Sequence, residues 1–157
     1  MTRLPHVVTA FAMAVGASLI LPQHPAHAAA TAVEWSANGG TACERYLTPV
    51  VTDAILNSHA GSPKRADATS CNSFPIYIKL SAANVAAFRA QLPRVADAHP
   101  IVGIGDAAYW NEAGALSAVK GDRGCVINVL VPGSTKVTGE ALAQKLGAVC
   151  NQLFALP

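Results

Sequence analysis

The sequence predicts an α+β domain in which helices pack on an antiparallel sheet, with disulfide bonds stapling the two. Three observations predict it. The expected elements run helix, helix, strand, helix, hairpin, helix, so that sheet and helices are partly segregated. Gly121-Asp122 lies between two apolar runs and indicates a hairpin, because glycine supplies the positive φ of a tight turn. The chain also has 4 cysteines, an even number that is typical of small disulfide-bonded exported domains.

Residues 1–28 have the features of a cleavable signal peptide. Arg3 precedes an uncharged apolar run, Val7 to Leu21, and Ala26-His27-Ala28 gives the small-x-small pattern that precedes a cut. An uncleaved anchor is the alternative, but the run is shorter than the ~20 apolar residues of a spanning helix. We therefore expect a periplasmic or secreted bacterial protein that starts near Ala29 and has no membrane span after cleavage.

Charge and histidine content narrow the classes of function. The chain has 11 Lys and Arg against 9 Asp and Glu, and cleavage removes one basic residue, Arg3. The nearly neutral mature domain lacks the basic surface that binds nucleic acid or anionic lipid. Only His59 and His99 follow the cleavage site, and no C-x-x-C pair occurs. We therefore expect no metal site and no cofactor.

The mature chain begins with a predicted loose segment, residues 29–40, and continues as a single domain, residues 41–157. Within the loose segment, Val33–Trp35 would be a short edge strand and Asn38–Gly40 a turn.

Two short helices are expected next. Thr41 and Glu44 fit a capping box, in which the two side chains satisfy the first free amides of a helix. Thr48-Pro49 is typical of a second N-terminus, because Thr caps it and Pro suits its first position. The apolar stripe of this second helix would be Val51, Ala54 and Ile55.

A loop, a strand and a helix follow. Residues 57–70 are polar and are predicted as an exposed loop. Residues 71–80 alternate apolar and polar side chains as a half-buried strand does, with Pro75 near its start. Ser81 would cap a helix whose apolar face is Val85, Phe88 and Leu92, and Pro93 would end or kink it.

The C-terminal third gives the strongest patterns. After a loop at residues 99–105, the runs Ala115–Lys120 and Cys125–Val131 are the strands of the predicted hairpin. The second run is apolar at nearly every position, as in a central strand covered on both faces. Thr138 would cap a last helix, residues 139–154, with Leu142, Leu146, Val149 and Leu153 on one face.

Four cysteines allow three pairings. Cys125 shares a strand face with Ile127 and Val129, and Cys150 shares a helix face with Leu146. If that helix packs on that strand face, Cys125 and Cys150 can form a disulfide. The other two cysteines are Cys43 and Cys71, and buried free thiols are the alternative to any pairing.

The chain resembles an uncharacterised family of small exported bacterial domains, many of them lipoproteins. The resemblance lies in Cys43–Pro49, in Cys71 at the start of a strand, in Val102–Trp110, in the hairpin at Lys120–Asp122 and in the Leu-Ala pattern at Ala141–Ala143. It implies a PsbP/Mog1-like sheet with helices, a Cys43–Cys71 disulfide and no catalytic residues to transfer. This chain lacks the lipid-anchor cysteine of the lipoprotein members, which favours soluble release.

Several motifs have both a functional and a structural interpretation. Residues 103–108 match the dinucleotide fingerprint G-x-G-x-x-A, but no β-α-β unit surrounds them, so a turn capped by Asp106 is favoured. Tyr109 and Trp110 are candidate ligand-binding residues together with Asp106, although such a pair more often plugs a core edge. Asp106 and Glu112 would be the carboxylate pair of a glycoside hydrolase, and His99 is interpreted as a loop histidine.

The leading hypothesis for function is a non-enzymatic exported domain that binds a partner or a small ligand in the cell envelope or outside the cell. Few histidines, no metal pattern and no nucleophile motif favour it over catalysis. A small cell-wall hydrolase using Asp106 and Glu112 is one alternative. A secreted inhibitor of a foreign hydrolase, presenting residues 57–70 as a rigid loop, is another.

Overall fold

The computed structural model describes Trp35 and residues 39–156. The predicted signal peptide and most of the predicted loose segment lie outside the described residues. Trp35 is helical, not part of an edge strand, and it is buried in the core with 3% of its surface exposed. Helix α2 begins at Gly39, so the predicted turn at Gly39-Gly40 is wrong.

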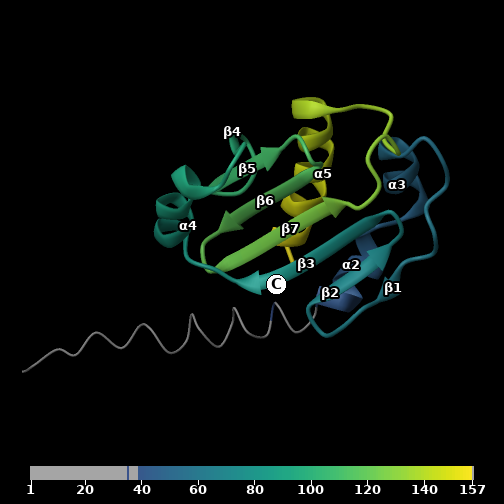
Figure 1. The fold of residues 1–157 in the computed structure, drawn as a ribbon. Coiled ribbons are helices and arrows are strands. Elements are labelled where there is room, and N and C mark those ends of the chain that lie inside the picture. Colours follow the sequence, from purple (N-terminus) through teal and green to yellow (C-terminus); the bar gives the residue numbers. More distant parts are fainter. Residues whose placement is uncertain (1–34, 36–38, 157) are drawn as a thin grey trace, which may run out of the picture.

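The described residues form a 7-stranded sheet in the order β1-β2-β3-β7-β6-β5-β4, with every neighbouring pair antiparallel (Figure 1). The strands are β1 (Lys64–Arg65), β2 (Ser70–Ser73), β3 (Ile76–Ala82), β4 (His99–Ile101), β5 (Ala107–Asn111), β6 (Ala115–Lys120) and β7 (Arg123–Val129). The predicted hairpin is confirmed, because Lys120 pairs with Arg123 across Gly121-Asp122 and Gly121 has φ 59°.

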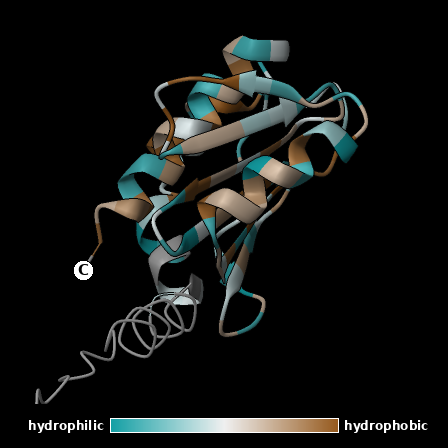
Figure 2. Ribbon diagram, turned by 90° about the vertical axis from the view of Figure 1, so that its left-hand side faces the viewer, coloured by the Kyte–Doolittle hydropathy of each residue, from teal (hydrophilic) through white to brown (hydrophobic). Residues whose placement is uncertain are grey.

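The helices are α2 (Gly39–Tyr46), α3 (Pro49–Ile55), α4 (Val85–Gln91), the 3-10 turn η1 (Leu92–Arg94) and α5 (Gly139–Phe154). α5 packs on the central strands, and α2 packs on β1 and β2. α4 lies on the opposite face of the sheet from α5, because Phe88 stacks on Tyr109 while the next residue, Trp110, faces the α5 side. Helical segments on both sides of the strands are visible in the turned view (Figure 2).

The core lies between α5 and one face of the sheet. β7 is the central strand, as predicted, but it is not covered equally on both faces: Cys125, Ile127 and Val129 are buried, whereas Val126 and Asn128 are partly exposed. A disulfide joins Cys125 of β7 to Cys150 of α5 with a Cα–Cα distance of 5.9 Å. The expected packing of the last helix on this strand is therefore confirmed.

Cys71 is also disulfide-bonded. The predicted Cys43–Cys71 pairing involves the Cys43 side chain, which lies outside the described residues.

Local caps agree with the sequence at α3 and differ at three other helices. Thr138 precedes α5 as predicted, but its side chain makes no capping hydrogen bond. Thr48 caps α3 by accepting a hydrogen bond from the Val51 amide at 3.4 Å. The predicted capping box is wrong, since Thr41 lies inside α2. α4 is capped by Asn84, whose Oδ1 accepts from the Ala87 amide at 2.9 Å, because β3 extends through Ser81 to Ala82.

Two predicted faces are modified by burial. In α3 the buried residues are Thr52 and Ile55, whereas Ala54 is exposed. The Thr52 hydroxyl can be buried because it donates to the carbonyls of Thr48 and Pro49. The expected face of α4, formed by Val85, Phe88 and Leu92, is only half-buried.

Three stretches of chain were misassigned. Residues 71–80 form two strands and not one, because Pro75 cannot donate to a ladder and Phe74-Pro75 makes the turn between β2 and β3. The predicted loop at residues 99–105 begins with β4, which pairs with β5 from His99 to Ile101. The predicted loop at residues 57–70 contains β1.

Candidate functional site

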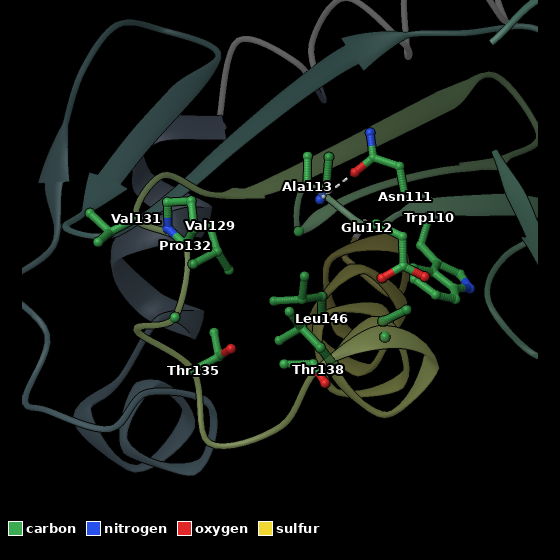
Figure 3. Close-up of a pocket in the computed structure, with 16 residues that line it drawn as sticks. Trp110, Asn111, Glu112, Ala113, Val129, Val131, Pro132, Thr135, Thr138 and Leu146 are labelled. Atoms are coloured by element: carbon green, nitrogen blue, oxygen red, sulfur yellow. Dashed lines mark hydrogen bonds between the residues drawn. The ribbon is translucent and has the colours of Figure 1, made fainter. Parts of the chain in front are cut away.

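A pocket opens at the end of the sheet where the β5–β6 turn, the segment after β7 and the first half of α5 meet (Figure 3). Its volume is about 180 Å³. The lining residues are Trp110, Asn111, Glu112, Ala113, Gly114, Ala115, Val129, Val131, Pro132, Gly133, Thr135, Thr138, Gly139, Leu142, Ala143 and Leu146. The antiparallel order brings these segments together, because the end of β5, the start of β6 and the end of β7 lie at the same end of the sheet.

The floor of the pocket is apolar. Val129, Leu142 and Leu146 are buried side chains from β7 and α5. Figure 3 shows Val129 and Pro132 on one side of the pocket and Leu146 on the other. The floor therefore offers dispersion contacts to an apolar group and no charged partner.

Trp110 and Glu112 lie at the mouth of the pocket, and His99, which does not line it, packs against both. The His99 ring stacks on Trp110 with centroids 4.6 Å apart. His99 Nε2 lies 3.9 Å from Glu112 Oε1, and 68% of the Glu112 side chain is exposed. The indole also reaches the start of α5, where a Cβ on Gly139 would lie 3.6 Å from its edge.

Hydrogen bonds hold the walls of the pocket. The Asn111 side-chain oxygen accepts from the Ala115 amide at 3.0 Å and closes the β5–β6 turn, as the dashed line in Figure 3 shows. Asn57 Nδ2 donates to the carbonyls of Gly133 and Thr135, and the Lys136 amide donates to the Ile55 carbonyl. The segment after β7 is thus tied to the end of α3, so the pocket is formed in the unliganded chain.

Tyr109 and Trp110 do not form a platform together. Neighbouring residues of a strand point to opposite faces, so Trp110 lines the pocket while Tyr109 stacks on Phe88 of α4 with centroids 5.3 Å apart. The structural interpretation, a plug at the edge of a packed layer, describes Tyr109. Trp110 is the predicted ligand-binding residue that the structure places in the pocket wall.

Asp106 lies at the other end of β5. Its Oδ2 accepts a hydrogen bond from the Gly121 amide at 2.7 Å, which ties the β4–β5 turn to the hairpin turn. The prediction that Asp106 caps free amides is thus right in kind, but the partner is a turn far along the chain. Asp106 and Glu112 flank the whole of β5, a separation of about 20 Å at ~3.3 Å per residue. Glycosidase pairs lie roughly 5–9.5 Å apart, so these two carboxylates are not such a pair.

The glycines at 103 and 105 serve packing. They form the turn between two antiparallel strands, and no helix follows, so the dinucleotide interpretation is wrong. Asn151 of α5 donates to the Gly103 carbonyl at 2.9 Å and accepts from the Gly105 amide at 3.0 Å. Gly105 has φ 55°, and a Cβ there would lie 2.4 Å from the Val119 carbonyl oxygen.

Among the described residues, one other titratable pair borders a hollow: Asp53 and His59 line a second pocket of about 280 Å³ beside α3. His59 Nδ1 lies 3.1 Å from Asp53 Oδ1, but 93% of its side chain is exposed. Two hydrogen bonds from Thr69 lower the pKa of Asp67 to about 2, in a turn away from the pocket. Within the described ranges, no group of three or more His, Cys, Asp or Glu side chains is placed to hold a metal ion.

Comparison of the chain with protein-family models, curated proteins and solved structures gives no significant match. The resemblance to the exported bacterial family therefore stays a prediction. Among the described residues, no helix is long and apolar enough to cross a membrane.

Proposed function

We propose that this chain is an exported, non-enzymatic domain that binds the apolar part of a small ligand in the pocket beside Trp110. The observation that carries the proposal is the preformed pocket itself, whose apolar floor lies under an aromatic and partly polar rim. Concave, mostly apolar sites with a few polar groups are where proteins usually hold small molecules.

The volume indicates the size of the bound group. A cavity of about 150 Å³ lined by aliphatic side chains accepts benzene. The pocket here, at about 180 Å³, suits one ring or one branched aliphatic group better than a large metabolite. The expected ligand therefore inserts one ring-sized group and leaves its remainder at the mouth.

Two observations favour binding in the pocket over the alternative functions. The hydrolase alternative depended on Asp106 and Glu112, which β5 separates. The inhibitor alternative required residues 57–70 as a protruding loop, but β1 pairs with β2 and Ser73 Oγ donates to the Gly61 carbonyl at 2.6 Å. The predicted signal peptide and the disulfides support export to an oxidising compartment.

An NMR titration of the mature domain with p-cresol and cyclohexanol tests the proposal. We expect the Trp110 indole resonance and the amides of Gly139 and Leu146 to shift, and the Trp35 indole to stay in place. Ala113→Trp should abolish these shifts, because Ala113 is an exposed turn residue on the rim and a bulky side chain there covers the mouth.

The matched control is Ala96→Trp, at an exposed turn residue that does not line the pocket. It should bind the probes like the unaltered domain. Absence of binding by every ring-sized probe, or equal binding by the Ala113→Trp variant, would show that the pocket is not a ligand site.

A further inference from the structure

We propose that the ligand of this pocket carries a cationic amine two or three bonds from its ring-sized apolar group. The inference rests on the proposed function, since it names the ligand class for the same pocket. It is carried by the charges around the mouth and by the aromatic ring beside them.

The mouth has a surplus of negative charge. The Glu112 carboxylate lies on the rim. Its ionisable neighbour is His99, whose Nε2 lies 3.9 Å from Glu112 Oε1, and no Lys or Arg of the described residues lies within ion-pair distance of it. Glu140 lies in the first turn of α5, next to the lining residue Gly139. The nearest basic residue along the chain, Lys136, donates its Nζ to the Asp53 carbonyl on α3.

The start of α5 explains why carboxylates are tolerated here. The N-terminus of a helix carries a partial positive charge of roughly half a unit, which favours acidic side chains close to it. Thr138, the residue before the helix, makes no side-chain capping hydrogen bond. Glu112 is the carboxylate that lines the pocket, and its full charge exceeds the partial charge of the helix end, so the mouth attracts a cation and repels an acid.

The indole adds a second attraction for the same group. An ammonium over the face of a Trp ring is drawn to its π electrons, and Trp is the strongest of the aromatic side chains in this respect. His99 stacks on one face of Trp110, so this contact requires the opposite face. Trp110 lines the mouth beside Glu112, and Figure 3 shows the carboxylate next to the ring. A ligand whose ring lies on Leu146 would thus have its amine beside both groups.

Two sources share this chemistry. A free aralkyl amine has it, and so does a peptide whose first residue is Phe or Leu, because its α-ammonium lies three bonds from the ring of Phe or from the branched carbon of Leu. The test therefore includes a probe of each kind.

The experiment compares isosteric probes by NMR titration at the Trp110 indole: phenethylamine, 2-phenylethanol and 3-phenylpropionate. We expect the amine to bind about three- to tenfold more tightly than the alcohol, the range for exposed ion pairs and cation–π contacts, and the acid to bind most weakly. Added salt should narrow the difference. Phe-Gly-Gly-amide and its N-acetylated form then separate a peptide N-terminus from a free amine as the source.

Glu112→Gln is the decisive variant. It should reduce the preference for the amine over the alcohol, because it removes the full negative charge of the rim while Trp110 stays in place. Glu112 is an exposed turn residue, so its replacement does not disturb the floor. Glu44→Gln on α2 makes the same change of charge outside the pocket lining and should keep the preference.

Equal affinities of the unaltered domain for amine and alcohol would overturn the inference while leaving the proposed function in place. So would a preference for the amine that is undiminished in Glu112→Gln. Failure of all three probes to bind would instead count against the proposed function.

Discussion

At the C-terminal half of α5 the loops of the sheet pack into the helix, whereas at its N-terminal half they stand away from it and leave the pocket. We call these regions the packed end and the open end. At the packed end, Ile104 fills the space above Gly147, and Asn151 holds the backbone of Gly103 and Gly105. At the open end, Gly114, Gly133 and Gly139 turn the chain around a cavity.

The difference separates stability from binding within one layer of the fold. The disulfide from Cys125 to Cys150 and the Arg123 contacts with the carbonyls of Phe154 and Leu156 also lie toward the packed end. The open end keeps buried apolar side chains without a group to fill the space between them. Substitutions at the packed end should therefore change the free energy of unfolding, and those at the open end should change the affinity for pocket ligands.

The largest effect is expected from removal of the disulfide by Cys125→Ala with Cys150→Ala. The two residues are 25 apart in sequence, and the loop-closure model gives a loss of about 3 kcal/mol in the free energy of unfolding. Urea unfolding measures it. Binding of p-cresol by the folded variant should persist, and a loss below ~1 kcal/mol would contradict the assignment of stability to the packed end.

Gly147→Ala should cost about 1–3 kcal/mol by overpacking. A Cβ at this position would lie 2.0 Å from Ile104 Cδ1, so the isoleucine must move. The same substitution in an Ile104→Ala background removes the clash, and alanine's higher helix propensity should then make it neutral or stabilising. Urea unfolding of the unaltered domain, the two single variants and the double variant gives the coupling energy between the two positions. Additive effects on the free energy of unfolding would show that the two residues do not touch.

Asp106→Ala should cost about 1 kcal/mol, because the Gly121 amide loses its acceptor. Asp106→Asn retains an acceptor oxygen and should cost less. Thermal unfolding distinguishes the two variants. If Asp106→Ala weakened the binding of pocket probes at unchanged stability, the separation between the two ends would be wrong.

The smallest effect concerns the stability of the domain at low pH. The folded state holds the pKa of Asp67 near 2, below the ordinary aspartate value of 3.8. This carboxylate therefore adds stability above pH ~4 that is lost as the pH falls toward 2. Asp67→Asn should therefore flatten the fall in Tm between pH 4 and pH 2. Calorimetry at several pH values measures this slope, and identical slopes would exclude a role for the Thr69 hydrogen bonds that lower this pKa.

Local patterns predicted the C-terminal part of the fold well. The hairpin at Gly121-Asp122, the helix at residues 139–154 and the Cys125–Cys150 pairing follow from periods of two and four residues that the tertiary structure left intact. The pattern at Pro75 was also readable, since a residue without an amide proton is poorly placed inside a strand. The turn there was missed because the apolar alternation continued past it.

The pocket could not be predicted in this way. Its walls come from the β5–β6 turn, the segment after β7 and the first half of α5, whose proximity depends on the order of the strands. Glu112 carries no local signal that separates it from a solvated carboxylate. The pairing of Tyr109 with Trp110 failed for a simpler reason. Once residues 107–111 are known to be a strand, the alternation of side chains sends these two rings to opposite faces.

The two outer strands of the sheet have a consequence for association between copies of the folded domain. β1 has 2 residues, both charged and exposed, and β4 has 3 residues with Pro100 at its centre. Short, charged or proline-bearing margins offer few free amide and carbonyl groups in a row, so a neighbouring chain has little to add a strand to. The folded domain is thereby protected at both margins against edge-to-edge polymerisation with neighbouring chains.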